Sequence, residues 1–197
     1  MTLKKQLYSP EEMTAAISMI AAAIRRDFDT DGSVPYALVG LYNQGVPLAE
    51  RICDEIERAT GRRPEHGRLD ISMYRDDVGL RSGLPLIRET VIPFNIDGHK
   101  IILVDDVLSS GRTIRAALDA ITDYGRPNMI RLAVLVDRGD PEYPIRADYV
   151  GFKLDLDPAH KVAVQFDEDG DEVKPIVIEG HTALWSGPEK ICSVSTT

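Results

Sequence analysis

The sequence predicts an α/β protein built on a doubly wound, mostly parallel sheet. Three apolar runs, at 36–42, 101–104 and 129–137, lack polar alternation and are typical of strands buried on both faces. Segments with apolar residues at helical spacing alternate with these runs, and the connections between them are short. This alternation favours parallel strands with helices on both faces of the sheet. Sheets of this kind bind ligands at the carboxyl ends of their strands.

The first helix is predicted by its capping signals and by its apolar stripe. Ser9 and Glu12 have the spacing of a capping box, and Pro10 occupies the first helical position. Apolar residues at helical spacing continue through 13–28. We therefore expect one long helix that ends before the turn residues 30–33.

The remaining elements follow from the same patterns and from turn residues. Residues 68–75 alternate apolar and polar side chains, which predicts a strand. Residues 76–100 contain several glycines and prolines without a helical period, which predicts a mobile hairpin lid. The other predicted elements are a strand at 36–42, a helix from about Pro47, a strand from 101 with a helix after 113, strands at 129–137 and 147–153, and a closing hairpin of 161–166 with 173–179.

The composition is that expected of one soluble domain. The chain has 197 residues, a formal net charge of −9, and no apolar run near the roughly 20 residues of a membrane span. Its N-terminus lacks the apolar core of a signal peptide, so we expect a cytoplasmic protein without a membrane partner. The two cysteines and four histidines show no disulfide or metal-ligand spacing. We predict a single domain over residues 1–180 and a flexible tail at 181–197.

Residues 101–113, IILVDDVLSSGRT, carry the strongest chemical signal in the chain. An apolar run leads into a small polar loop, and helical spacing begins directly after it. Backbone N–H groups are unpaired at the start of a helix, and the helix dipole favours an anion there. Gly111 allows close approach of the backbone, and Ser109, Ser110 and Thr113 add hydroxyl donors. The loop therefore predicts a phosphate-binding site.

Two adjacent carboxylates, Asp105 and Asp106, stand between the apolar run and this loop. Carboxylates repel a phosphate, so we expect them to accept hydrogen bonds from the two hydroxyls of a ribose, with Mg²⁺ nearby. The ligand predicted from these residues is a ribose 5-phosphate. The alternative without a ligand is a strand, an Asp-rich turn and a well-capped helix.

The stretch 101–113 resembles the signature of the type I phosphoribosyltransferases, which bind 5-phosphoribosyl 1-diphosphate (PRPP). Further segments narrow the likeness: 70–77 (DISMYRDD), 124–127 (YGRP) and 132–151. Together they resemble the PyrR family, pyrimidine operon attenuators that are also uracil phosphoribosyltransferases, over about residues 8–168. The resemblance implies the type I phosphoribosyltransferase fold, and the conversion of uracil and PRPP to UMP and diphosphate.

The resemblance also implies a role for each matching residue. Asp105 and Asp106 are the expected catalytic residues and the candidate ligands of a Mg²⁺ that arrives with the substrate. The nucleotide-binding set is Asp105, Asp106, Val107, Leu108, Ser109, Ser110, Gly111, Arg112 and Thr113. The other sets are Asn43, Gln44 and Gly45 in a pyrophosphate loop, Arg75, Arg81 and Arg88 in the lid, and Val136, Asp137, Arg138 and Val162 around the uracil. The lid arginines are cations able to close over the leaving pyrophosphate.

Two departures from the family patterns bear on the substrate. PyrR proteins often carry a Lys or Arg in the pyrophosphate loop, whereas this chain has Tyr42, Asn43 and Gln44, which implies weaker PRPP affinity. Superfamily members specific for 6-oxopurines usually carry an Asp two positions before the loop glycine, where this chain has Ser109. The missing acid favours a pyrimidine. Without the resemblance, 42–45 is equally a tight turn, and the lid arginines are equally a solvated charged loop.

Two regulatory alternatives stay open. In one, the protein is a UMP-responsive RNA-binding attenuator with weak or no catalysis, and in the other it is a catalytically silent UMP sensor. RNA binding needs clustered Lys and Arg, but residues 13–28 carry only Arg25 and Arg26, and the net charge is −9. RNA is therefore a disfavoured partner, although a local basic patch is compatible with a negative total. The family likeness also predicts a homodimer or a higher homo-oligomer.

Overall fold

Helices and strands alternate along most of the chain, as expected from the sequence. The structure is a computed structural model that describes residues 2–28, 35–76, 87–156, 160–166 and 176–181. The elements are β1 (Thr2–Tyr8), α1 (Pro10–Phe28), β2 (Tyr36–Leu41), α2 (Gly45–Thr60), β3 (Glu65–Leu69), β4 (Lys100–Leu108), α3 (Arg112–Ile121), β5 (Met129–Asp137), β6 (Tyr149–Lys153), β7 (Lys161–Ala163) and β8 (Ile176–His181). Short 3₁₀ turns lie at Ser72–Tyr74 and Thr122–Tyr124.

Five strands form a parallel sheet in the order β3-β2-β4-β5-β6. The chain runs outward from β2 to β3 on one side, then returns at β4 and continues outward to β6 on the other side. The strand order therefore reverses between β2 and β4. Open α/β sheets bind ligands at the carboxyl ends of the strands beside such a reversal. The predicted doubly wound sheet is confirmed, and it brings the segments after β2 and β4 next to each other.

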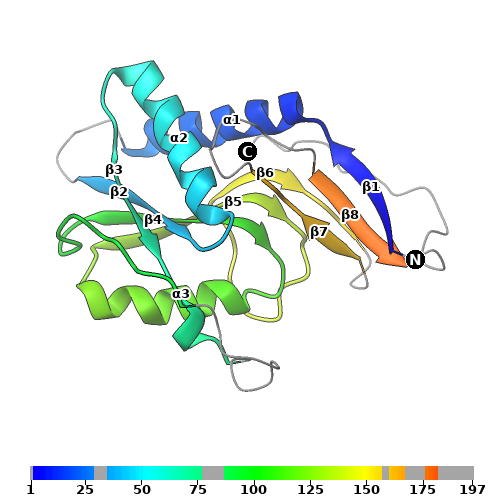
Figure 1. The fold of residues 1–197 in the computed structure, drawn as a ribbon. Coiled ribbons are helices and arrows are strands. Elements are labelled where there is room, and N and C mark those ends of the chain that lie inside the picture. Colours follow the sequence, from blue (N-terminus) through cyan, green and yellow to red (C-terminus); the bar gives the residue numbers. More distant parts are fainter. Residues whose placement is uncertain (1, 29–34, 77–86, 157–159, 167–175, 182–197) are drawn as a thin grey trace.

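Helices cover both faces of this sheet, with α1 and α2 on one face and α3 on the other (Figure 1). Ile20 of α1 and Ile52 of α2 belong to the first core, and Ile114 of α3 belongs to the second. Strand β4 contributes to both cores, because Ile102 packs into the first and Leu103 into the second. Burial on both faces explains why this strand shows no polar alternation in the sequence.

The start of α1 is the predicted capping box. The backbone N–H of Ser9 donates to Glu12 Oε2 at 2.8 Å, and the N–H of Glu12 donates to Ser9 Oγ at 3.3 Å. These reciprocal bonds satisfy two backbone donors that the helix start leaves unpaired. The prediction of this helix, which the structure places at Pro10–Phe28, is confirmed.

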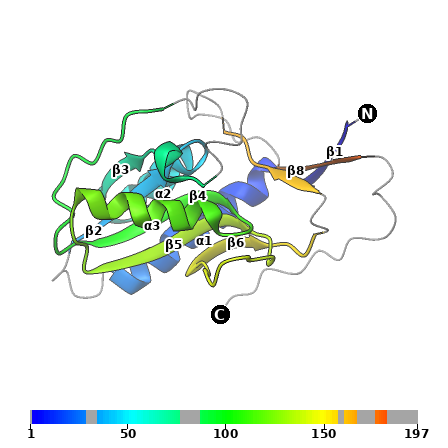
Figure 2. The same ribbon diagram turned by 90° about the horizontal axis from the view of Figure 1, so that it is seen from below.

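A second sheet, of which the sequence predicted only two strands, lies beside the first. Strands β1, β8 and β7 pair antiparallel in that order. Figures 1 and 2 show them on the side toward which the parallel strands point. Tyr8 stacks on Phe152, with ring centroids 3.7 Å apart, and this contact joins β1 to β6. The predicted antiparallel pair of β7 and β8 is confirmed, whereas β1 was not predicted because its polar centre at 4–6 breaks any apolar alternation.

The strand predicted at 68–75 is wrong in its bounds, because β3 spans Glu65–Leu69. Asp70 Oδ1 accepts hydrogen bonds from the N–H of Ser72 at 2.8 Å and from its hydroxyl at 2.6 Å. A local side-chain bond of this kind competes with the ladder of the sheet and ends the strand. Strand β4 differs in the opposite sense, since it continues through the two aspartates to Leu108.

Part of the predicted lid and almost all of the predicted tail lie outside the described residues, namely 77–86 and 182–197. Within the described residues 87–99, one isolated antiparallel bridge joins Val91 to Arg68. The mobile lid and the flexible tail stay predictions. None of the helices in the described ranges is long and apolar enough to cross a membrane.

Candidate active site

Three segments meet at the carboxyl edge of the parallel sheet. Residues 42–45 follow β2, residues 105–113 span the end of β4 and the start of α3, and residues 137–140 close β5. Strand β4 pairs with both β2 and β5, so these ends are neighbours. The N–H of Arg138 donates to the carbonyl of Leu108 at 2.9 Å. The segments predicted for pyrophosphate, nucleotide and uracil therefore lie at one edge.

Asp105 and Asp106 form a carboxylate pair inside β4. Asp105 is buried, Asp106 is half-buried, and the N–H of Asp106 donates to Asp105 Oδ1 at 3.0 Å. Burial raises the pKa of Asp105 well above its ordinary value, and the charge of Asp106 raises it further. Burial also raises the pKa of Asp106. Two negative charges are therefore disfavoured here without a ligand, and hydroxyl donors or a cation would favour the ionised form.

The loop after β4 owes its shape to Gly111. Its φ of 88° is left-handed, and it directly precedes the first residue of α3. A Cβ at this position would lie 3.3 Å from Tyr143 Cβ. The carbonyl of Ser110 accepts the N–H groups of Glu142 and Tyr143, both at 3.0 Å, which holds the loop against that segment. Gly111 has no side chain to cap the helix, and the N–H of Arg112 donates to Ser110 Oγ at a long 3.4 Å, so the N–H groups that follow in the first turn of α3 can face an anion.

Ser109 links the nucleotide loop to the turn after β5. Its hydroxyl donates to Asp140, with Oγ 3.2 Å from Oδ1. Asp140 also contacts Arg138, whose buried side chain places Nη2 3.5 Å from Oδ2. Asp140 was not among the predicted site residues, because 31 residues separate it from Ser109. Its position directly after the VDRG turn was the one signal that could have drawn attention to it.

The side chain of Arg112 is engaged by two carboxylates from other segments. Its Nη2 lies 2.6 Å from Glu142 Oε2, and its Nη1 lies 2.9 Å from Asp76 Oδ2. The ring centre of Tyr143 lies 5.6 Å from its guanidinium carbon. The predicted nucleotide-binding residue thus brings its backbone N–H to the start of α3 while its guanidinium pairs with acids. Neither acid was predicted to belong to the site.

The 42–45 segment is fixed by close contacts on both sides. A Cβ on Gly45 would lie 2.3 Å from the carbonyl oxygen of Val104, so glycine lets α2 begin directly against β4. Gln44 Oε1 accepts the N–H of Phe166 at 3.0 Å, which ties the segment to the chain after β7. Two of the three predicted pyrophosphate-loop residues therefore shape the loop through contacts within the protein.

The third residue of that loop, Asn43, contacts an arginine from the predicted lid. Arg88 donates from Nη1 to Oδ1 of Asn43, and its guanidinium carbon lies 5.1 Å from the ring centre of Tyr42. The Tyr42 hydroxyl in turn donates to the carbonyl of Glu89 at 3.3 Å. The peptide bond between Tyr42 and Asn43 is cis. The structure thus brings Arg88 to the predicted pyrophosphate loop.

The other two predicted lid arginines are placed differently. The charge of Arg75 acts to lower the pKa of Asp105, against the larger effect of burial, so Arg75 favours the ionised form of that carboxyl. Arg81 lies outside the described residues. Of the three arginines, the structure therefore relates Arg88 to the 42–45 loop and Arg75 to the acid pair.

The residues predicted to contact uracil divide between the two sheets. Val136 is buried in the first core, and Arg138 is buried behind Asp140. Asp137 Oδ1 accepts the N–H of Gly139 at 2.9 Å, which closes the turn after β5. Val162 lies in β7 of the second sheet, half-buried against the first core. The structure therefore groups 136–138 beside the nucleotide loop and places Val162 on a different sheet.

The donor set of the acid pair fits a magnesium ion shared with a substrate. Mg²⁺ prefers oxygen ligands and commonly takes one or two carboxylates together with substrate phosphates and water. Asp105 and Asp106 supply such oxygens, and their raised pKa values mark a position where a cation stabilises the ionised form. In the part of the chain that the structure describes, no group of three or more His, Cys, Asp or Glu side chains could hold a metal.

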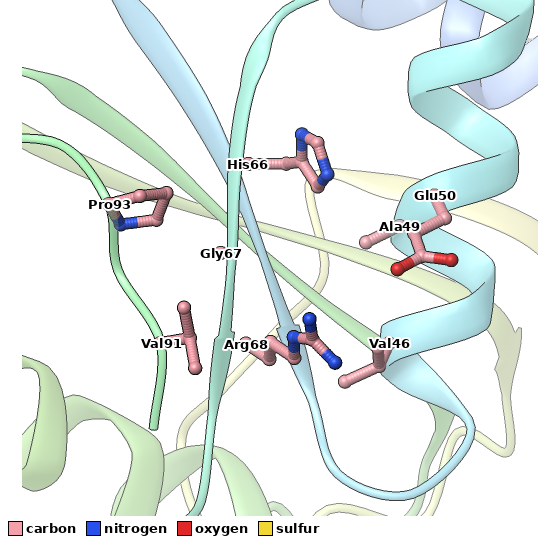
Figure 3. Close-up of a pocket in the computed structure, with 8 residues that line it drawn as sticks. All are labelled: Val46, Ala49, Glu50, His66, Gly67, Arg68, Val91 and Pro93. Carbon is pink, nitrogen blue, oxygen red and sulfur yellow. The ribbon is translucent and has the colours of Figure 1, made fainter. Parts of the chain in front are cut away.

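A small cavity of about 130 Å³ lies beside the start of α2 (Figure 3). Its walls come from α2, β3 and the chain that runs along β3: Val46, Ala49, Glu50, His66, Gly67, Arg68, Val91 and Pro93. No residue of the predicted nucleotide site lines it. Pockets that bind small molecules usually measure about 300–1,000 Å³, so this cavity is not a candidate for the nucleotide site.

The sequence matches a known enzyme family over most of its length. Residues 4–169 match the model of the phosphoribosyl transferase domain. A relative from Chloroflexus aurantiacus named Bifunctional protein PyrR is 45% identical, over 90% of this chain and 96% of its own. A second protein of that name, from Thermus thermophilus, is 46% identical over 87% of this chain and 94% of its own.

Solved structures agree with this fold. The hypoxanthine phosphoribosyltransferase of Trypanosoma cruzi matches with a TM-score of 0.66 at 20% identity, over 88% of this chain and 95% of that one. A hypoxanthine-guanine phosphoribosyltransferase from Bacillus anthracis matches with a TM-score of 0.64 at 19% identity, over 88% and 96%. These likenesses establish the type I phosphoribosyltransferase fold, which confirms the predicted class. With the domain match and the relatives above, the chain belongs to the PyrR family of phosphoribosyltransferases.

Proposed function

We propose that the protein transfers the phosphoribosyl group of PRPP to uracil and releases UMP and diphosphate. The observation that carries the proposal is the acid pair of β4 followed by the glycine-shaped start of α3, at the reversal of the strand order. Ribose hydroxyls need acceptors and a phosphate needs N–H donors, and this unit offers both side by side. Membership of the PyrR family directs the proposal to a pyrimidine.

Each part of PRPP has a matching part of the site. The 5-phosphate is bound by the backbone N–H groups of residues 110–113 and by the hydroxyls of Ser110 and Thr113. The ribose hydroxyls donate to Asp105 and Asp106. The diphosphate lies over the 42–45 loop, and the uracil lies against the turn after β5. Asp105 and Asp106 would hold a Mg²⁺ ion that arrives with the substrate, and this ion would supply positive charge to the leaving group.

The reaction breaks the bond between C1 of the ribose and the diphosphate oxygen, and it forms a bond from C1 to N1 of uracil. The electron pair of the broken bond leaves with the diphosphate, and the N1 proton of uracil is released to the solvent. Positive charge develops on the ribose and negative charge on the diphosphate. The carboxylates of Asp105 and Asp106 stabilise the positive charge on the ribose, and cationic groups around the 42–45 loop stabilise the negative charge on the diphosphate. The protein otherwise positions the two reactants and excludes water. No side chain has to act as a covalent nucleophile.

The surroundings of Ser109 support a pyrimidine as the accepting base. Purine-specific relatives place an acid at the position of Ser109, where it serves a ring nitrogen of the purine. Asp140, which contacts this position, already accepts the Ser109 hydroxyl and contacts Arg138. A purine nitrogen would therefore compete with these partners for the carboxylate.

A product assay with several bases tests the reaction and the choice of base together. The protein is incubated with PRPP and MgCl₂, and uracil, orotate, hypoxanthine or guanine is added separately before chromatography of the products. We expect UMP from uracil, and products from the other bases at rates lower by about two orders of magnitude. Omission of PRPP is the control. Preferential formation of a purine nucleotide, or no product from any base, would overturn the proposal.

UMP-responsive RNA binding is a second candidate function, because the relatives carry the name bifunctional. In that function, the same pocket would bind UMP and alter the affinity of the protein for a transcript leader. Homo-oligomerisation and a cytoplasmic location also stay predictions. Size-exclusion chromatography with light scattering measures the oligomer directly.

A further inference from the structure

The 42–45 loop contains no Lys or Arg, although the proposed function places a doubly phosphorylated leaving group over it. The guanidinium of Arg112 is not available to that group, because it pairs with Glu142 and Asp76. A diphosphate over a loop without a cation must find positive charge elsewhere. Among the contacts of the described residues, the guanidinium of Arg88 lies directly against this loop.

The direct contacts of the Arg88 guanidinium are with uncharged groups, although its charge also acts to lower the pKa of Asp70. In the part of the chain that the structure describes, the guanidinium contacts the amide oxygen of Asn43 and the ring face of Tyr42, and both groups are uncharged. The side chain is exposed, so its remaining N–H donors can reach a ligand at the loop surface. Arg88 therefore differs from Arg112, whose guanidinium is paired with two carboxylates.

The backbone of Arg88 is anchored to the end of β3. Its N–H donates to Asp70 Oδ2 at 2.5 Å, and the N–H of Asp70 donates to Thr90 Oγ1 at 3.0 Å. Next to this anchor, Val91 and Arg68 of β3 exchange backbone hydrogen bonds at 2.8 and 2.9 Å. Figure 3 shows Val91 beside Arg68 on this adjoining segment. The Arg88 backbone is thus fixed relative to the sheet.

Asp70 is the central acceptor of this anchor. Burial acts to raise its pKa, but hydrogen bonds from Ser72 and from the N–H of Arg88 outweigh burial and hold the pKa below its usual value. Asp70 is therefore ionised at neutral pH. A charged acceptor makes a stronger hydrogen bond to the Arg88 N–H than a neutral one does.

We propose that Arg88 supplies the positive charge of the 42–45 loop and binds the diphosphate of PRPP, and that Asp70 is the residue that positions it. The inference rests on the proposed function for the presence of a diphosphate at this loop. It adds a source for a charge that the loop sequence lacks. It also makes Asp70, Tyr42 and Asn43 parts of one diphosphate-binding unit.

Calorimetry of ligand binding in the presence of Mg²⁺ tests the role of Arg88. We expect Arg88→Gln to weaken the binding of PRPP and of inorganic diphosphate by roughly tenfold or more, because a charge-assisted hydrogen bond is lost. UMP contains no diphosphate, so its dissociation constant should stay within about twofold. Arg88→Lys keeps the charge but loses the planar guanidinium with its several N–H donors. Its affinity for PRPP and diphosphate should lie between those of the wild type and Arg88→Gln.

Arg126→Gln is the matched control, because it removes the same charge from an exposed arginine near the opposite end of β4. Its affinities should equal those of the wild type. Unchanged diphosphate affinity in Arg88→Gln would overturn the inference. A wild type that binds PRPP but makes no UMP from uracil would refute the proposed function and leave the inference intact, whereas a wild type that binds no PRPP refutes both.

The positioning role of Asp70 has its own test. Asp70→Asn should weaken diphosphate binding several-fold and leave UMP binding unchanged, which a general loss of structure would not do. In the double variant of Asp70→Asn with Arg88→Gln, the loss of diphosphate affinity should be little larger than in Arg88→Gln alone. Both substitutions act on the same contact, that of Arg88 with the diphosphate. Additive effects would overturn the positioning role. If Asp70→Asn does not fold, Thr90→Val replaces it. This variant removes the hydrogen bond from the Asp70 N–H to Thr90, and it is combined with Arg88→Gln in the same double-mutant cycle.

Discussion

Asp106 is half-buried in β4, where its carboxylate can accept the hydroxyl hydrogens of a bound ribose. Asp106→Asn keeps the shape of the side chain but places an amide donor where those hydroxyls need an acceptor. We expect the fold to be retained and kcat/KM to fall by on the order of 10²-fold or more, a few kcal/mol of transition-state stabilisation. Steady-state kinetics measures kcat/KM, and circular dichroism measures whether the fold is retained. Near wild-type kinetics would show that Asp106 does not belong to the active site.

The same pair of aspartates controls how activity depends on pH. Burial raises the pKa of both carboxyls, so kcat/KM of the wild type should rise with pH, with a midpoint above the range of an ordinary aspartate. In Asp106→Asn, the midpoint of the residual rate should move to lower pH, because the charge of Asp106 no longer raises the pKa of Asp105. An unchanged midpoint would show that another group controls the rise of kcat/KM with pH.

Asp105 should lower the stability of the protein without ligand, because burial raises its pKa in the folded state. As pH rises above about 4, the unfolded chain releases this proton first, so folding loses free energy until the folded-state pKa is passed. Asp105→Asn removes this penalty and should raise the free energy of unfolding at pH 8 by about 1 kcal/mol or more. Urea unfolding at pH 8 and below pH 4 measures it, and the gain should vanish at the lower pH.

At the scale of elements, the loop between β4 and α3 depends on one glycine. Gly111→Val should abolish the binding of both PRPP and UMP, because a β-branched residue opposes a φ of 88° and its Cβ would press on Tyr143. Calorimetry decides the outcome. Gly98→Val is the control, since Gly98 has a φ of 78° and open space around a Cβ. It should lose about 1–2 kcal/mol of stability and bind UMP normally. Unchanged UMP affinity in Gly111→Val would show that this loop does not hold the phosphate.

Element bounds were predictable where local bonds decide them and unpredictable where distant strands do. The capping box of Ser9 and Glu12 lies within four residues, and it set the start of α1 correctly. Strand β1 forms because it pairs with β8, which is near the other end of the chain. The end of β3 was predicted too late, because the side chain of Asp70 competes with the ladder and the alternation of apolar residues does not reveal this.

At the scale of the whole molecule, the surface charge bears on RNA binding. The exposed face of α1 carries Glu11, Glu12, Met19 and Arg26, so it is not a continuous basic surface. The net charge of −9 adds a general repulsion of a phosphate backbone. Affinity for RNA depends on the counterions that Lys and Arg contacts release. We therefore expect weak RNA binding with a shallow dependence on salt.

A gel-shift titration with a pyrimidine-leader hairpin tests this expectation. The titration is made with and without UMP, at two salt concentrations and with nonspecific competitor RNA. A small change of affinity between the two salt concentrations would agree with few phosphate contacts. Tight, UMP-enhanced binding that survives the competitor would contradict the expectation. It would show that residues distant in the sequence, such as Arg25, Arg26 and Arg146, assemble a basic patch.

The sequence by itself determined the fold class, the family, and the order of the acid pair and the glycine-containing loop that follows it. These features are local. The hydrophobic period of an element, the capping residues of a helix and the order of residues 105–113 can each be recognised in a short stretch of sequence. Burial of β4 on both faces is likewise visible as an unbroken apolar run.

Only the tertiary structure decided which side chains from distant segments complete the site. Three hydrogen bonds join side chains that are far apart in the sequence. They link Asn43 with Arg88, Ser109 with Asp140, and Arg112 with Asp76, at separations of 45, 31 and 36 residues. Such pairs depend on the strand order and on the path of each connection, which no short pattern encodes. The strand order reverses between β2 and β4, and that reversal gathers at one edge the groups that the sequence keeps apart.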